Sequence, residues 1–308
     1  MIRIKAYYLL LSVLATIAYA SSSGSIQAQV SRAELAFYCD AMANTIDGKN
    51  RQYAYDKFIS AFEKILYADG SFEDDFSDLK WVSVKYSEEK TFRVITLQLI
   101  DSMNLHHYSG FIQLSDGKIY RLNNVRKKDK DMEFEQMNVD EWYGALYYNM
   151  MRVERAGKPI YLLFGYDGNN AKTKRKILDV LSFEDGSPIF GAEIIKEKRE
   201  GARNLLRNRI ILEYAADANV NLHYNPGLNA IVHDFLVPRM DFNERDEYAL
   251  VPDGTYVAYE WDGNFLVKID MLPIEASDPK DIFYKPKPSE NKDIFGKEKS
   301  AKTKKRKQ

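Results

Sequence analysis

The sequence from Ile160 to Phe183 reads IYLLFGYDGNNAKTKRKILDVLSF. Two runs within it, IYLLFGY and ILDVLSF, are rich in the aliphatic and aromatic residues that favour β-strands. Asp167-Gly168 directly follows the first run, and both residues tolerate the positive φ angles that a type I′ hairpin turn requires. The stretch therefore predicts a β-hairpin whose turn contains Asp167-Gly168.

A second interpretation makes Asp167–Asn170 a loop that binds Ca²⁺, because this cation prefers several oxygen ligands. An EF-hand-like loop would continue with acidic residues and a bidentate Glu. Here the loop continues instead with basic residues that would repel a cation, namely Lys172, Lys174, Arg175 and Lys176. We therefore expect a turn without a metal.

The pattern of the hairpin extends in both directions along the chain. From residue 79 to residue 272, about a dozen short apolar runs alternate with turn residues, and no helical pattern separates them. Asp-Gly occurs seven times, and most copies lie between two such runs, beginning at residues 47, 69, 116, 167, 185, 253 and 262. This pattern predicts an antiparallel β meander or sandwich, and it disfavours a doubly wound sheet.

Residues 31–68 precede this β body and have helical periodicity. Ser31 and Glu34 have the spacing of a capping box, which starts a helix. Apolar residues recur at helical spacing up to Leu66, and Asp69-Gly70 follows. We predict an α+β fold that is mainly β, in which a helical hairpin at 31–68 packs on the body at 79–272 within one domain.

The first 20 residues have the layout of a signal peptide. Arg3 and Lys5 precede an apolar run of 15 residues, which is shorter than the ~20 that a membrane-spanning helix needs. Cleavage is expected after Ala20, or after Ala28 at a second, weaker site; the alternative is a retained membrane anchor. We expect export to the periplasm, cell surface or medium, with no transmembrane segment after removal of the leader.

The charges divide unevenly between the body and the C-terminal segment. Residues 275–308 carry a net charge of +5, whereas residues 6–274 carry −8. An acidic body argues against nucleic acid binding there. The basic segment has the composition of a disordered tail, and the motif KDIF occurs in it twice. Either the repeat arises by chance, or it offers partner-binding residues, namely Ile282, Phe283, Ile294 and Phe295.

His223 and His233 flank a turn and are the only weak candidates for a metal site. In one hairpin register they would be cross-strand neighbours, and Asp253 or Glu260 would supply a third ligand for zinc. A shift of one residue places them on opposite faces of the sheet. We expect ordinary strand histidines. Since the sequence also lacks a Gly-rich phosphate loop and paired C-x-x-C motifs, we expect no metal and no cofactor.

Two further sets of residues suggest chemistry. A glycosidase would need two converging carboxylates, which the sequence spacing does not identify among Asp167, Asp179, Asp234, Asp253 and Glu260. Aromatic side chains suggest a surface that stacks on a carbohydrate ligand, and the candidates are Trp142, Tyr143, Tyr148 and Trp261. The alternative for these four residues is ordinary packing within strands.

Stretches such as GFIQLSDGKIYRL, WYGALYYNM and VPDGTYVAYEW are similar to those of an exported protein family of unknown function from Bacteroidetes-type bacteria. The resemblance covers roughly residues 31–272. It implies an envelope or secreted location, and it transfers no catalytic residue. Our first hypothesis is an exported, non-enzymatic protein that binds an envelope protein or a polysaccharide or other polymer. The alternative is a secreted hydrolase that acts on glycan or peptide.

Overall fold

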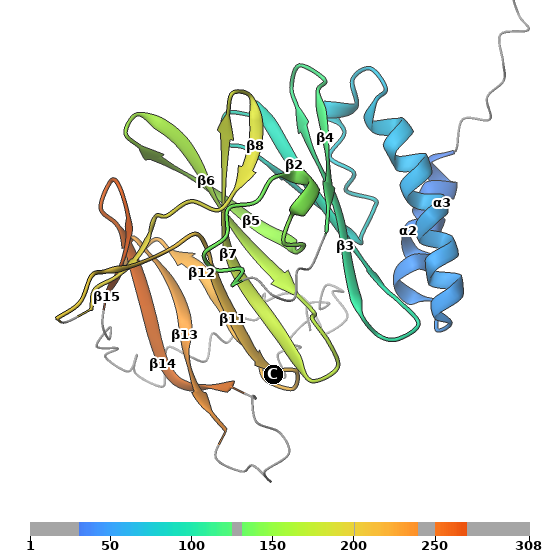
Figure 1. Cartoon of the computed structure of the whole chain (residues 1–308). Helices are drawn as coiled ribbons and strands as arrows, with labels where there is room; N and C mark the ends of the chain where they lie inside the picture. The colour runs from blue at the N-terminus through green and yellow to red at the C-terminus, as the bar shows by residue number, and fades with distance from the viewer. Residues whose placement is uncertain (1–30, 125–130, 200, 240–249, 270–308) are drawn as a thin grey trace, which may run out of the picture. The chain divides into compact units, whose positions relative to one another are not determined.

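The computed structural model describes residues 31–124, 131–199, 201–239 and 250–269 (Figure 1). The predicted signal peptide at 1–20, with both cleavage positions, and the predicted tail at 275–308 lie outside these residues. So do the partner-binding candidates Ile282, Phe283, Ile294 and Phe295.

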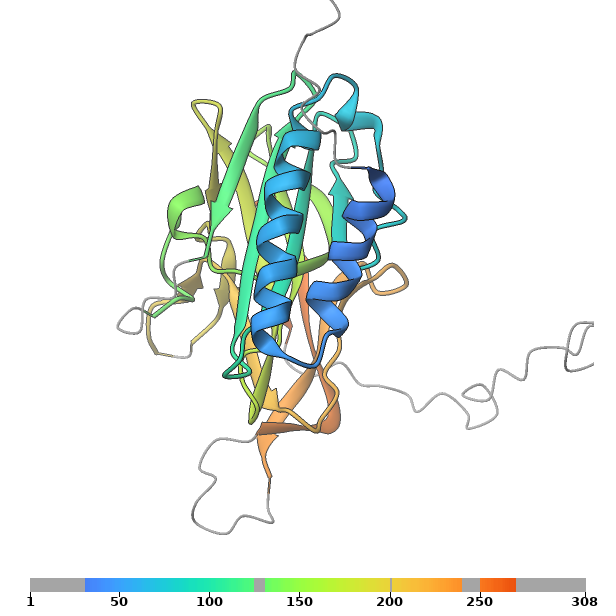
Figure 2. The ribbon, with the colours of Figure 1, turned by 90° about the vertical axis from the view of Figure 1, so that its right-hand side faces the viewer.

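The predicted helical hairpin is present as α2 (Arg32–Asn44) and α3 (Gly48–Leu66). Ser31 Oγ accepts a hydrogen bond from the Glu34 amide at 3.1 Å, as the capping pattern predicts. The carboxylate of Asp47 caps α3 by accepting from the amides of residues 49 and 50. A short 3₁₀ turn, η1 (Ser71–Glu73), follows α3. The two helices lie side by side across one face of a sheet (Figure 2).

The sheet beneath the helices, here the first sheet, is an antiparallel meander in the order β1-β2-β3-β4. Its strands are β1 (Val82–Tyr86), β2 (Phe92–Ile100), β3 (His106–Leu114) and β4 (Ile119–Asn123). Because side chains alternate along a strand, β2 serves two cores. Ile95 and Leu97 pack with the helices, whereas Phe92 and Val94 pack on the opposite side.

The central sheet has the order β11-β7-β6-β5, and β8 extends it by pairing with β7. Its strands are β5 (Leu146–Arg155), β6 (Lys158–Asp167), β7 (Thr173–Glu184), β8 (Ser187–Phe190) and β11 (Ile210–Ala215). The turn η2 (Val139–Glu141) precedes it. Tyr161 and Leu163 of β6 face the first sheet, and Leu162 and Phe164 face the third. Burial on both faces explains why IYLLF is continuously apolar.

The third sheet has the order β10-β9-β15-β14-β13-β12. Its strands are β9 (Ile195–Glu197), β10 (Leu205–Arg207), β12 (Leu222–Asn225), β13 (Ala230–Pro238), β14 (Leu250–Trp261) and β15 (Leu266–Ile269). β15 and β9 pair in parallel, which differs from the wholly antiparallel prediction, while the other pairs are antiparallel. β9 is the first strand of this sheet in the chain and β15 the last, so a local hairpin pattern does not predict their pairing.

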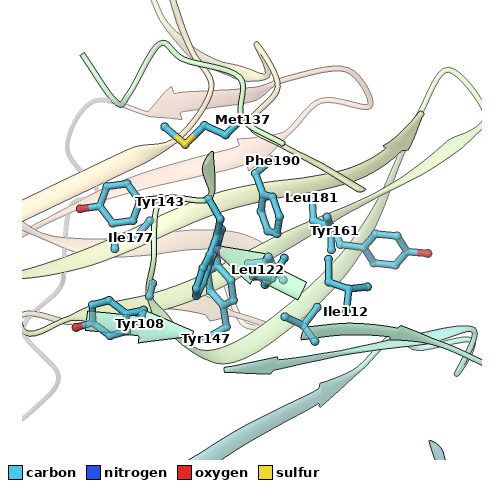
Figure 3. Close-up of a cluster of buried hydrophobic side chains, with 14 of the residues drawn as sticks. Tyr108, Ile112, Leu122, Met137, Tyr143, Tyr147, Tyr161, Ile177, Leu181 and Phe190 are labelled. Atoms are coloured by element: carbon cyan, nitrogen blue, oxygen red, sulfur yellow. The ribbon is translucent and has the colours of Figure 1, made fainter. Parts of the chain in front are cut away.

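Three buried clusters hold these layers together. One lies between the helices and the first sheet, one between the first and central sheets, and one between the central and third sheets. Figure 3 shows the middle cluster, to which β3 contributes Tyr108 and Ile112 and the central sheet contributes Tyr147 and Ile177. The predicted class is therefore confirmed: a mainly β fold with an N-terminal helical hairpin packed on antiparallel sheets.

The Asp-Gly pairs have several roles. Asp185-Gly186 joins β7 to β8 with φ angles of 48° and 75°, the positive values of a type I′ turn. The pairs at 116 and 262 also lie between paired strands. Asp253-Gly254, by contrast, lies inside β14, where residues 253–255 form an irregularity opposite one residue of β13, so this pair does not make a hairpin turn.

The only cysteine, Cys39, is buried on α2. Within the ranges that the structure describes, no helix combines the length and the apolar character needed to cross a bilayer.

Candidate ligand cavity

Asp167, in the predicted hairpin turn, is fully buried. Its carboxylate accepts hydrogen bonds from the Tyr108 hydroxyl at 3.0 Å and from the Asn169 amide at 2.8 Å, and Arg175 Nη1 lies 3.5 Å away. The connection between β6 and β7 spans residues 168–172, so a two-residue turn is wrong. Because side chains alternate along β6, Asp167 points towards the first sheet. There the Tyr108 hydroxyl binds both the Asp167 carboxylate and the Gly168 amide, which holds the start of the connection against that sheet.

A second buried carboxylate, Asp179, lies further along β7. It accepts hydrogen bonds from Arg209 Nε and the Tyr147 hydroxyl, both at 2.9 Å, and Asp179 and Arg209 are both 0% exposed. The Trp142 indole donates to the Tyr147 hydroxyl at 2.9 Å. This network lies inside the core, so Asp179 is not exposed to a substrate.

The four aromatic stacking candidates do not form one exposed surface. Trp142 and Tyr143 are 0% and 4% exposed, so the expectation that they stack on a surface ligand is wrong. Both pack in the core between the first and central sheets. Tyr148 and Trp261 are half-buried against the other core, and the Tyr148 hydroxyl donates to the Leu222 carbonyl at 2.7 Å. Ordinary packing accounts for all four.

The register of β12 and β13 separates the two candidate metal ligands. Leu222 lies opposite His233, and His223 lies opposite Val232, so the imidazoles point to opposite faces. His223 is exposed and His233 is 6% exposed. The proposed third ligands, Asp253 and Glu260, are both exposed. In the described part of the chain, no group of three or more His, Cys, Asp or Glu residues is arranged to hold a metal ion.

His233 instead lines a cavity of about 270 Å³ between β11 and the strands β13–β15. Alternation and register place a polar row on the inner face of the third sheet. Arg207 and Glu197 come from β10 and β9, and Lys268 and Tyr259 lie opposite each other on β15 and β14. The row borders the apolar core between the central and third sheets, so polar and apolar walls meet at the cavity.

Arg207 links two carboxylates of the cavity. Its Nη1 lies 2.6 Å from Glu197 Oε1, and its Nε lies 3.5 Å from Glu133 Oε2. Glu197 Oε1 also accepts from the Tyr259 hydroxyl at 3.2 Å, and Glu133 Oε1 accepts from the Ile211 amide at 3.1 Å. The two glutamates are thereby fixed in position by protein donors.

Burial disfavours the charged forms of three cavity groups and thereby shifts their pKa values. It raises the pKa of Glu133, although the Arg207 charge and the Ile211 amide oppose the shift. It lowers the pKa of His233, and it raises the pKa of Tyr259, to which the Glu197 charge adds. The cavity therefore holds a neutral imidazole, a neutral phenol and a carboxyl group that protonates more readily than usual.

A larger hollow, of about 430 Å³, follows the edge strand β1. Its walls are mostly successive residues of one segment, from Leu79 to Lys85. It lacks the several titratable side chains from separate strands that converge on the smaller cavity, and we therefore take the smaller cavity as the candidate site.

Among the charged residues and the histidine that line the cavity, His233 alone was a candidate from the sequence. Glu133, Glu197, Arg207 and Lys268 come from four segments that only the parallel pairing of β9 with β15 and the crossing of two sheets bring together. The one available signal was Lys268 in the run FLVKIDM, since a lysine within a buried strand's pattern is unusual.

No model of a protein family matches this sequence, and no match is found among curated proteins or solved structures. The resemblance to an exported family therefore stays a prediction.

Proposed function

We propose that this chain is an exported, non-enzymatic protein that binds an envelope protein or a polymer, and that the cavity between β11 and β13–β15 holds one unit of that ligand. The leader pattern at residues 1–20 supports export. A volume of about 270 Å³ is near the lower end of the ~300–1,000 Å³ typical of ligand pockets, which suits a single residue or sugar unit.

The observation that carries the binding proposal is the pairing of every carboxylate in the cavity. Glu197 accepts from Arg207 and Tyr259, and Glu133 accepts from the Ile211 amide. Glu213 accepts from Arg175 Nε at 2.7 Å and from a threonine hydroxyl. A catalytic carboxylate must instead reach the proton or carbon that reacts. Carboxylates held by protein donors favour a fixed binding wall.

One specific observation favours the alternative, a hydrolase that acts on glycan or peptide. Glu133, with a raised pKa, and His233, with a lowered pKa, line the same cavity. A pair of groups whose pKa values shift in this way can act as a general acid and a general base. The two functions therefore share one site and differ in whether a bond is broken there.

Binding and turnover can be measured with the same variants. The mature chain is assayed for binding to a panel of cell-wall polysaccharides and envelope proteins. Leu236→Trp fills the cavity, and Leu228→Trp is the control because Leu228 lies in an exposed turn. We expect Leu236→Trp alone to abolish binding. Equal binding by both variants would place the ligand elsewhere.

For the hydrolase alternative, the same polymers and peptides are incubated with the parent, Glu133→Gln and His233→Gln. The binding proposal predicts no products from any of the three. Turnover by the parent that falls about 10²-fold or more in either variant would establish the hydrolase instead.

Export has its own measurement, which is N-terminal sequencing of the protein from its native host. The expected first residue is Ser21, or Gln29 if the second site is used. Finding Met1 in a membrane fraction would overturn the export proposal.

A further inference from the structure

Besides Arg207 Nε, which is buried without a hydrogen-bond partner 3.5 Å from Glu133 Oε2, two side chains of the cavity have hydrogen-bonding capacity that no other described residue uses. His233, 6% exposed, makes one hydrogen bond through Nδ1, which lies 2.8 Å from the Asp234 carbonyl oxygen. Its Nε2 has no partner within the described ranges. The Lys268 ammonium forms neither a hydrogen bond nor an ion pair with a described residue. The carboxylates of the same cavity, Glu197 and Glu133, pair with Arg207 instead. These two groups are thus free to bind a ligand.

The hydrogen bond of His233 fixes which nitrogen carries its proton. A backbone carbonyl only accepts, so Nδ1 must carry the hydrogen. Burial lowers the pKa of the ring, and the nearby Lys268 charge adds to this effect, so the imidazole is neutral at pH 7. Nε2 is then an acceptor, and it matches a ligand N–H or O–H.

Lys268 supplies the complementary group, a cation with three donors. It lies opposite Tyr259 on the inner face of the third sheet, and Tyr259 in turn stacks on His233 with ring centroids 5.9 Å apart. Lys268 lies opposite Tyr259 and His233 opposite Val257, two residues along β14. With strands about 4.8 Å apart and a rise of about 3.4 Å per residue, the backbones of Lys268 and His233 are about 12 Å apart, and the Lys268 charge acts on the His233 ring. Their side chains can therefore bind adjacent groups of one small ligand.

The rest of the wall combines apolar side chains with three carboxylates, Glu133, Glu197 and Glu213, that protein donors already hold. Leu212, Phe235, Leu236 and Val257 line the cavity, and Phe235 is 43% exposed at its edge. A ligand that fits all three features carries a carboxylate, a hydrogen-bond donor beside it and an apolar side chain. The C-terminal residue of a peptide ending in an aliphatic amino acid has this arrangement, because its own amide N–H lies next to the carboxylate.

We propose that the cavity captures the C-terminal residue of an apolar-ended polypeptide, with the carboxylate on Lys268, the terminal amide N–H on His233 Nε2 and the side chain against Phe235, Leu236 and Val257. This inference rests on the proposed function, since it specifies the envelope-protein ligand of the same cavity. Capture of a terminal carboxylate is an established mode of peptide recognition.

The test uses isothermal titration calorimetry on the mature full chain with three probes of similar size. N-acetyl-L-leucine has the carboxylate, the N–H and the apolar group; N-acetyl-L-leucinamide lacks the charge; octanoate lacks the N–H. We expect N-acetyl-L-leucine to bind and each of the others to bind at least ~10-fold more weakly, which corresponds to the loss of one hydrogen bond to a charged or buried group.

Variants assign the contacts. Lys268→Met should lose the preference for N-acetyl-L-leucine over its amide, and Lys268→Arg should retain it. Lys196→Met is the matched control, because Lys196 precedes Glu197 on β9 and points to the opposite face. His233→Phe should bind N-acetyl-L-leucine and octanoate equally. Thermal unfolding of each variant shows whether it remains folded.

The outcomes separate the two proposals. If octanoate binds to the parent with the same affinity as N-acetyl-L-leucine, the ligand is a simple carboxylic acid and the peptide assignment is overturned. Lack of binding by all three probes would overturn it as well. If Leu236→Trp still abolishes binding of a polymer or protein in that case, the proposed function stands and only this inference fails.

Discussion

The Tyr108 hydroxyl of β3 donates a hydrogen bond to Asp167 Oδ1 of β6 at 3.0 Å and accepts one from the Gly168 amide at 2.7 Å. Tyr108 belongs to the first sheet and Asp167 to the central sheet, and both are buried. This pair therefore fixes the β6–β7 connection against the neighbouring layer and makes it part of the core.

Removing either member of this pair should destabilise the fold strongly. Tyr108→Phe leaves a buried carboxylate with one donor fewer and should cost about 1.5–3 kcal/mol in the free energy of unfolding. Asp167→Ala should cost about 1–3 kcal/mol for each buried donor that it leaves without an acceptor, the Tyr108 hydroxyl and the Asn169 amide, while Arg175 keeps its ion pair with Glu213. Urea denaturation measures both values. Asp185→Ala, in the exposed type I′ turn, is the control and should cost no more than about 1 kcal/mol. Equal losses for Asp167→Ala and Asp185→Ala would contradict the structural role.

Asp179 and Arg209 form a fully buried ion pair at 2.9 Å. Breaking a buried pair leaves one charge without compensation, so Asp179→Asn and Arg209→Met should each destabilise the chain by about 3–5 kcal/mol. The double variant should be less unstable than the sum of the two, because neither charge is then left alone. A double-mutant cycle in urea measures this coupling. Strictly additive losses would show that the two residues act independently.

The sequence predicts the layers of this fold better than their connections. The helical hairpin and the strand series follow from local periodicity and capping, as at Ser31 and Glu34. Asp185-Gly186 forms the expected turn because its surroundings are exposed. Asp167-Gly168 does not, because Tyr108, 59 residues away in the sequence, binds its carboxylate. Long-range partners of this kind leave no local pattern in the sequence.

Gly48 provides a test of such a long-range constraint. In an ordinary helix, Gly→Ala is stabilising by about 1 kcal/mol. A Cβ at residue 48 would lie 2.4 Å from the backbone Cα of Ser102, in the β2–β3 connection. Gly48→Ala should therefore lower the melting temperature, whereas Lys49→Ala, at the next and exposed position, should leave it nearly unchanged. A higher melting temperature for Gly48→Ala would show that α3 and the connection are not in this contact.

The candidate cavity was largely invisible in the sequence. His233 was a candidate from the sequence, but its predicted neighbours, Asp253 and Glu260, are exposed. Glu197 and Tyr259 lie beside its ring instead. One residue of register decides which face each side chain takes. Without the β12–β13 register, no spacing rule separates His233 from His223.

The two histidines also provide a matched test of the cavity's electrostatics. Burial lowers the pKa of His233 below its ordinary value of 6.5. At pH values between its lowered folded pKa and 6.5, the unfolded chain therefore binds a proton at His233 that the folded chain does not. Its contribution to stability is fully present above pH 6.5 and is lost as the pH falls through this window.

His233→Gln should accordingly reduce the loss of unfolding free energy between pH 7.5 and pH ~5, measured by urea denaturation at each pH. His223→Gln, which changes the same residue type on the exposed face of β12, should follow the parent curve. The raised pKa of Glu133 acts with the opposite sign, since the folded chain keeps that proton longer, but it is common to parent and variant. The difference between the two curves thus isolates His233. A His233→Gln curve that coincides with the parent curve, or a His223→Gln curve that departs from it instead, would contradict a buried, neutral imidazole in the cavity.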